Sequence, residues 1–171
     1  MLTRMTAHYP SGWAVELATL DDFTTIQAIL TDRCRWLGQK GIRQWPAAGF
    51  PPDVIEKAID EETMYTARVG KEIVGTFTLR DTDKLWRGYL GAALHVRRMA
   101  THTSWGGRGI GGAMLSWTVQ RAIDDARSFV RLSCVLNDGA LAAYYESEGF
   151  SRVAQITEDN TEVVLMERAA E

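Results

Sequence analysis

Residues 104–113 read SWGGRGIGGA and contain five glycines within seven positions, namely Gly106, Gly107, Gly109, Gly111 and Gly112. Glycine loses more conformational freedom on folding than any other residue, so such a run is unusual inside a helix or a strand. It indicates either a flexible turn or a loop that a ligand must approach closely.

The surroundings of this glycine run separate three kinds of phosphate site. The nucleotide P-loop requires a lysine and a hydroxyl residue after its last glycine, and neither follows here. The dinucleotide fingerprint G-x-G-x-x-G is present as Gly107, Gly109 and Gly112, but Leu132 stands where its acidic residue belongs. The remaining phosphate-binding interpretation is a helix start whose backbone N–H groups hold a pyrophosphate, with Arg108 either adding a charged contact or lying solvated.

The composition is that of an ordinary globular protein. The chain has 171 residues, of which 46% are hydrophobic and 24% charged. We expect a flexible tail over residues 1–12 and a single domain over residues 13–171. A net charge of −3 lacks the basic surplus of nucleic-acid-binding domains, and no apolar stretch approaches the roughly 20 residues that span a membrane. The N-terminus has no signal-peptide core, so we expect a cytoplasmic protein without nucleic-acid or membrane partners.

Cysteine and histidine spacing predicts no metal site. Cys34 and Cys134 lie a hundred positions apart in apolar surroundings and are interpreted as buried free thiols. His8, His95 and His102 show no metal-ligand spacing with each other or with the cysteines.

Hydrophobic periodicity predicts a mixed α/β protein. Helices are expected over 21–37 and 52–60, from the glycine run to about 127, and from a cap at Asn137 or Asp138 to Gly149. Strands are expected over 13–19, 63–69, 72–80, 89–100, 130–136, 150–157 and 162–168. Gly70-Lys71 predicts a hairpin between the second and third of these strands.

A second motif follows the predicted strand 130–136. Asn137 is followed by a helix that ends in Tyr145–Phe150, which has the form Y-x-x-x-G-F. With the glycine run and the order of elements, this motif makes residues 13–168 resemble the GNAT-type N-acetyltransferases. The resemblance implies a mixed, mostly antiparallel sheet of six to seven strands flanked by about four helices.

The resemblance also implies acetyl-CoA as co-substrate. The pantetheine arm is then expected along Met99, Ala100 and Thr101, and the pyrophosphate on the glycine loop. The loop positions implied are Gly106, Gly107, Arg108, Gly109, Ile110, Gly111 and Gly112. Gly106 stands where the family has Gln or Arg, and this predicts weaker cofactor binding, since a charged hydrogen bond contributes about 1.5–3 kcal/mol.

Acetyl transfer needs a neutral amine, a stabilised oxyanion and a proton for the leaving thiolate. The resemblance implies Tyr145 as the proton donor, with Tyr144 as the alternative. Asn137 is expected either to bind the pantetheine arm or to cap its own helix.

His95 is the predicted general base. A two-residue period places His95, Arg97, Met99 and Thr101 on one face of their strand, and the resemblance puts the family's base glutamate at position 95. A pKa near 6.5 suits proton removal at neutral pH. The alternatives are a half-buried structural histidine and a chain of water molecules.

Trp36, Trp45 and Trp86 are the candidates for the acceptor pocket, with Asp81 and Asp83 nearby. Aromatic walls with carboxylates would suit a cationic amine. Trp36 could equally belong to the core, and the two aspartates could be plain loop acids.

These expectations define an acetyl-CoA-dependent N-acetyltransferase for a primary amine of a small molecule or peptide. Acetylation of protein N-termini or lysines, and a non-catalytic domain that senses acetyl-CoA, remain open alternatives. The resemblance leaves a homodimer open as well.

Overall fold

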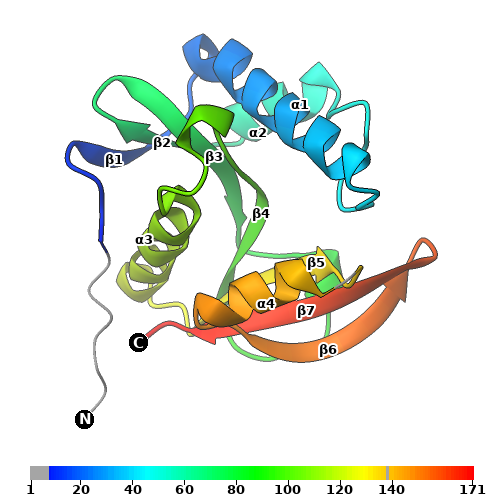
Figure 1. Ribbon diagram of the computed structural model, residues 1–171. Coiled ribbons are helices and arrows are strands. Elements are labelled where there is room, and N and C mark those ends of the chain that lie inside the picture. The colour runs from blue at the N-terminus through cyan, green and yellow to red at the C-terminus, as the bar shows by residue number, and fades with distance from the viewer. Residues whose placement is uncertain (1–7, 138) are drawn as a thin grey trace.

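A seven-stranded sheet forms the centre of the computed structural model, which describes residues 8–137 and 139–171 (Figure 1). The strands are β1 (Trp13–Leu17), β2 (Met64–Val69), β3 (Glu72–Arg80), β4 (Ala93–Thr101), β5 (Phe129–Val135), β6 (Ser151–Glu158) and β7 (Thr161–Ala169). They lie in the order β1-β2-β3-β4-β5-β7-β6. Only β4 and β5 pair in parallel; the other neighbours are antiparallel. The predicted fold class is confirmed.

Helices cover both faces of the sheet. They are α1 (Phe23–Gln39), α2 (Pro52–Asp60), α3 (Ile110–Asp124) and α4 (Ala140–Ser147). Side chains of β3 such as Phe77 pack with Met114 of α3, whereas Met64 of β2 packs with Ile26 of α1 and Ile55 of α2. The sheet therefore separates an α1–α2 side from an α3–α4 side, as Figure 1 shows.

The predicted tail over residues 1–12 lies partly outside the described residues. Within them, Tyr9 stacks on Trp13 with ring centroids 5.7 Å apart, and the Gly12 carbonyl accepts a hydrogen bond from Gly70 N–H. Gly70 has a φ of 61° at the predicted hairpin between β2 and β3. The start of the domain is thus tied to this hairpin.

A β-bulge interrupts β4 and changes which residues share a face. Thr78 pairs with Arg97 and Thr76 with Ala100, so three steps on β4 match two on β3. Arg98, inside the bulge, has a φ of 51°.

The extra residue reverses the alternation of β4 beyond the bulge. Thr101 pairs with Gly75 and lies on the α3–α4 side, while His95 and Arg97 lie on the α1–α2 side. The prediction that His95, Arg97, Met99 and Thr101 share one face is therefore wrong, because a strict two-residue period does not survive a bulge.

β4 and β5 diverge soon after they meet. Their parallel pairing joins Ala93–His95 to Phe129–Arg131. Beyond these pairs, β7 is the one strand with which β5 pairs among the described residues, and a gap opens between β4 and β5. This gap determines where the functional site lies.

Candidate functional site

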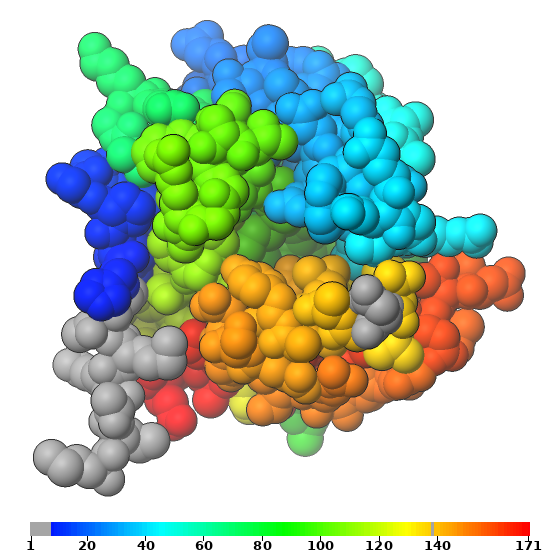
Figure 2. All heavy atoms as spheres, in the orientation of Figure 1, coloured from blue at the N-terminus to red at the C-terminus, as the bar shows by residue number. Residues whose placement is uncertain are grey.

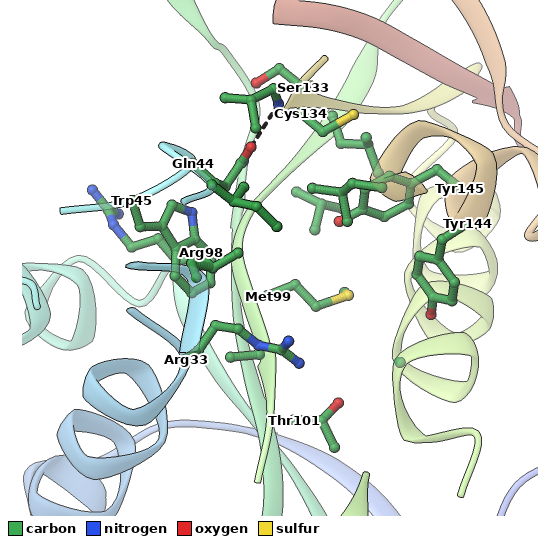
Figure 3. Close-up of a pocket in the computed structure, with 18 of the residues that line it drawn as sticks. Arg33, Gln44, Trp45, Arg98, Met99, Thr101, Ser133, Cys134, Tyr144 and Tyr145 are labelled. Carbon is green, nitrogen blue, oxygen red and sulfur yellow. Dashed lines mark hydrogen bonds between the residues drawn. The ribbon is translucent and has the colours of Figure 1, made fainter. Parts of the chain in front are cut away.

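A cavity of about 820 Å³ occupies the gap between β4 and β5. Its walls come from α1, the loop 40–51, the second half of β4, the start of α3, the second half of β5, and α4. Figure 2 shows the hollow on the surface between α1, in blue, and α4, in orange. Arg33, Met99 and Tyr145 point into it from three sides in Figure 3.

The start of α3 forms one end of the cavity. Gly109 is the N-cap, with a φ of 75° and no side-chain capping bond. The first backbone bond of the helix runs from Ala113 N–H to the Gly109 carbonyl, so the N–H groups of Ile110, Gly111 and Gly112 have no partner inside the helix. No atom lies within 4 Å of the position that a Cβ would take at Gly107 or Gly109. Open donors with open space before them fit the predicted pyrophosphate site.

Two glycines of the run also allow close approach of α4. A Cβ at Gly111 would lie 2.5 Å from the Tyr144 hydroxyl oxygen, and one at Gly112 would lie 3.0 Å from the Glu148 carboxylate. Helix packing therefore contributes to the glycine requirement, a reason that the sequence does not reveal.

Arg108 lies apart from the rest of the loop. Its guanidinium is 4.8 Å from the centroid of the Trp105 ring, whose Nε1 donates to Glu72 over 2.8 Å. Trp105 lines the cavity and Arg108 does not, so this position does not support the predicted contact of Arg108 with phosphate.

The two strand edges face each other across the cavity. Met99, Ala100 and Thr101 line it from β4, as the prediction for the pantetheine arm requires. On the opposite edge, the Val135 N–H donates to Gln44 Oε1 over 2.7 Å, the hydrogen bond drawn in Figure 3. Gln44 comes from the loop 40–51 and was missed at the sequence level, because nothing in a loop glutamine signals a partner 91 residues away.

Tyr145 reaches the cavity from α4 (Figure 3). Its ring lies 5.3 Å from that of Tyr144 and 5.9 Å from that of Phe150. Burial raises the pKa of Tyr145 above its usual value, so the hydroxyl holds its proton at neutral pH. Tyr144 instead places its hydroxyl beside Gly111, and burial raises its pKa to about 12.

Asn137 also lines the cavity, but it does not cap α4. The N-cap of that helix is Gly139, which makes no side-chain capping bond, and Asn137 has a φ of 36°. The capping alternative for Asn137 is therefore wrong, and Asp138 lies outside the described residues.

His95 lies away from the cavity. It is 5% exposed, its ring is 6.1 Å from that of Trp86, and its Nδ1 has no hydrogen-bond partner. Burial lowers the pKa of His95, while the Asp83 carboxylate opposes this shift. Neither His95 nor Trp86, which is 4% exposed, is among the lining residues. The structure therefore does not place His95 as a base or Trp86 as an acceptor contact, because both are buried against each other outside the cavity.

The two predicted carboxylates are engaged elsewhere. Asp83 accepts from the Leu85 N–H over 2.9 Å and lies 3.5 Å from Arg97, and Asp81 pairs with Arg127 over 2.7 Å. Neither lines the cavity, so the expected combination of tryptophans with aspartates is not assembled.

Cations replace those carboxylates on the α1 side. Trp36 and Trp45 line the cavity, and Trp36 is 44% exposed, which rules out its core alternative. The positively charged lining residues are Arg33, Lys40, Arg97 and Arg98. None of these was a candidate for the acceptor pocket at the sequence level, because no local pattern shows that cations of α1 and β4 face one cavity.

Both cysteines are free and buried, as predicted. Cys134 lines the cavity, and burial raises its pKa to about 11, so it is a neutral wall residue. Within residues 8–137 and 139–171, no cluster of three His, Cys, Asp or Glu residues could hold a metal ion. In the same part of the chain, no helix has the length and apolar character to cross a membrane.

Comparison with known proteins identifies this architecture. The family model of the acetyltransferase (GNAT) domain matches residues 60–152. The uncharacterized N-acetyltransferase YesJ of Bacillus subtilis is 22% identical over 141 residues, 78% of each chain. A GNAT-family acetyltransferase structure from Listeria monocytogenes superposes with a TM-score of 0.76 at 20% identity, covering 92% of this chain and 94% of that one. The putative acetyltransferase yncA of Salmonella typhimurium, solved with acetyl-CoA, has a TM-score of 0.67 at 14% identity, with 94% and 95% covered.

The matched model spans more than half of the chain, from the end of α2 to the start of β6. The chain belongs to the GNAT acetyltransferase family, and it is an N-acetyltransferase.

Proposed function

We propose that this protein transfers an acetyl group from acetyl-CoA to a primary amine of a small molecule. The observation that carries the proposal is one cavity that joins the open start of α3, the separated edges of β4 and β5, and the protonated hydroxyl of Tyr145. The acetyl-CoA named in the yncA structure supports the co-substrate.

The residues present fit acetyl-CoA. The N–H groups of Ile110, Gly111 and Gly112 would hold its diphosphate, and Met99, Ala100 and Thr101 would lie beside its pantetheine arm. Bound there, acetyl-CoA supplies the acetyl group as a thioester.

Tyr145 is the proposed general acid. The amine nitrogen forms a bond to the acetyl carbon as the carbon–sulfur bond breaks, and the sulfur leaves with the bonding electron pair. The Tyr145 hydroxyl gives this sulfur a proton and regains one from solvent. Its raised pKa keeps the proton available throughout the neutral range.

The amine loses its proton to water in this proposal. Among the described lining residues, Glu148 and Glu158 carry the only carboxylates, and there is no histidine. Glu158 is paired with Lys84 over 2.5 Å. The neutral fraction of the amine, set by pH, then controls the rate.

A small acceptor is favoured over a protein N-terminus or lysine. Gln44 already occupies the Val135 N–H, the strand-edge donor with which an extended peptide would pair. The alternative of a sensor without turnover is countered by the placement of Tyr145 in the cavity.

Thermal unfolding with acetyl-CoA, CoA, NADH or ATP in turn tests the co-substrate. A ligand at 100 times its dissociation constant stabilises the folded state by ~2.7 kcal/mol, which raises Tm by several degrees. We expect this shift with acetyl-CoA and CoA only. A shift with NADH, or with none of the four, would contradict the proposal.

A further inference from the structure

Arg98 occupies an unusual place in the cavity. It lies in the β4 bulge with a φ of 51°, a conformation that few side chains adopt without a reason. Its guanidinium lies 5.2 Å from the centroid of the Phe50 ring, in the loop 40–51. The side chain is therefore directed to the α1–α2 side and held there by an aromatic ring.

Among residues 8–137 and 139–171, no carboxylate forms an ion pair with Arg98. Burial lowers its pKa, and the other charges that act on it are those of Arg97 and Arg80, both cations. A guanidinium in this half-buried position without an anionic partner is costly. An anion that enters the cavity would remove this cost.

The neighbouring charges have the same sign. Arg33 and Lys40 also line the cavity, and each contacts the Trp36 ring, at 5.1 and 6.0 Å from its centroid. Two carboxylates line the cavity among the described residues: Glu158 is paired with Lys84, and Glu148 faces Gly112 at the start of α3. The α1 side of the cavity is thus positively charged.

The phosphates of acetyl-CoA do not account for Arg98. Their proposed partners are the backbone donors at Ile110–Gly112, on the α3–α4 side of the sheet. Arg98 contacts Phe50, which packs on the α1–α2 core, across the sheet from those donors.

We propose that the acceptor is a primary amine that also carries a carboxylate, an amino-acid-like molecule, and that Arg98 binds this carboxylate. The planar guanidinium offers paired donors that match two carboxylate oxygens, and Arg33 adds positive charge nearby. The inference rests on the proposed acetyl transfer and names its substrate class.

Pairs of amines that differ only in the carboxylate provide the test. L-phenylalanine is compared with 2-phenylethylamine, and L-leucine with 3-methylbutylamine, at saturating acetyl-CoA. The release of CoA thiol gives kcat/KM, expressed per neutral amine because the members of a pair differ in amine pKa. We expect the carboxylate-bearing member to react at least about tenfold faster, the size of one lost charged hydrogen bond.

Variants at position 98 assign the effect to this residue. Arg98→Gln should raise the KM for the carboxylate-bearing amine by about 10- to 100-fold and so remove the preference for it. The KM for acetyl-CoA should not change. Arg98→Lys should restore part of it. Arg80→Gln is the matched control, because Arg80 lies on the adjacent strand, outside this cavity, paired with Glu61 over 2.8 Å.

Binding provides a second readout that does not depend on turnover. The CoA complex of the wild type should gain Tm with L-phenylalanine or L-leucine, and the Arg98→Gln complex should not. The inference would be overturned if kcat/KM were equal or higher for the decarboxylated amines, or if neither amino acid raised the Tm of the CoA complex. Either result would leave the proposed acetyl transfer intact. No response to acetyl-CoA or CoA would instead overturn the proposed function.

Discussion

Two adjacent tyrosines of α4 differ in what they can do. Tyr145 projects into the cavity with its pKa raised, while the Tyr144 hydroxyl lies beside Gly111 at the start of α3. A one-residue step along a helix turns a side chain by about 100°, so adjacent positions face different surroundings. Both tyrosines line the cavity, and only the packed helix places the Tyr144 hydroxyl beside Gly111, which leaves Tyr145 as the proposed proton donor.

Tyr145→Phe tests this assignment. The ring and its contacts with Phe150 remain, so folding and CoA affinity should be unchanged. Loss of the donated proton should lower kcat by about 100-fold, the lower end of general-acid effects. Stopped assays of CoA release, with Tyr144→Phe as the matched control, measure it. If Tyr144→Phe loses activity instead, the proton donor is Tyr144.

At the scale of elements, the turn from η3 (Thr103–Trp105) into α3 leads into the diphosphate site that we propose. Gly106 has a φ of −59°, which any residue adopts, and a Cβ there would meet only the Thr103 carbonyl, at 3.4 Å. The backbone therefore does not require glycine at this position, in contrast to Gly109 with its φ of 75°. Glycine in place of the family's Gln or Arg at position 106 is therefore expected to alter contacts with the proposed ligand and to leave the fold unchanged.

Gly106→Gln should consequently strengthen acetyl-CoA binding without altering the structure. A restored hydrogen bond to phosphate is expected to lower Kd by about tenfold, the low end of charged hydrogen bonds. Isothermal titration with CoA measures the change, and Gly106→Ala, which adds a Cβ without an amide, controls for the backbone effect. An unchanged Kd in Gly106→Gln would show that no phosphate lies near this position.

At the scale of the whole molecule, His95 of β4 is buried against Trp86, which lies in the segment between β3 and β4. Burial, together with the charges of Arg131 and Arg97, lowers the pKa of His95, while Asp83 and Asp81 act in the opposite direction. In the unfolded chain His95 takes up a proton near pH 6.5, whereas in the folded chain it does so only at a lower pH. Folding stability contributed by this site is therefore present above about pH 6.5 and is lost as the pH falls below it.

His95→Gln should make the free energy of unfolding less dependent on pH between 7.5 and 5.5, as measured by urea denaturation. The pH dependence of CoA release should match that of the wild type, because His95 does not line the cavity. A changed pH–rate profile with unchanged stability would return His95 to the role of base.

The sequence by itself determined the order of strands and helices, the glycine loop at the start of α3, and the Asn137 and Tyr145 motif. These features depend on local periodicity, turn chemistry and spacing, which nearby residues encode. The same local rules failed at β4, where a bulge at Arg98 exchanged the faces, and at His95, where the Trp86 ring lies against a residue that alternation alone leaves open.

Only the tertiary structure decided the character of the acceptor side. Arg33, Gln44 and Arg98 come from α1, the following loop and β4, and they meet because β4 and β5 separate after three residue pairs. Whether a charged side chain has a partner of opposite charge depends on residues far away in the chain and on burial. Local sequence patterns contain neither kind of information. The tertiary structure therefore replaced the expected carboxylate-lined pocket with a cationic one, because Asp81 and Asp83 lie outside the cavity and pair with Arg127 and Arg97.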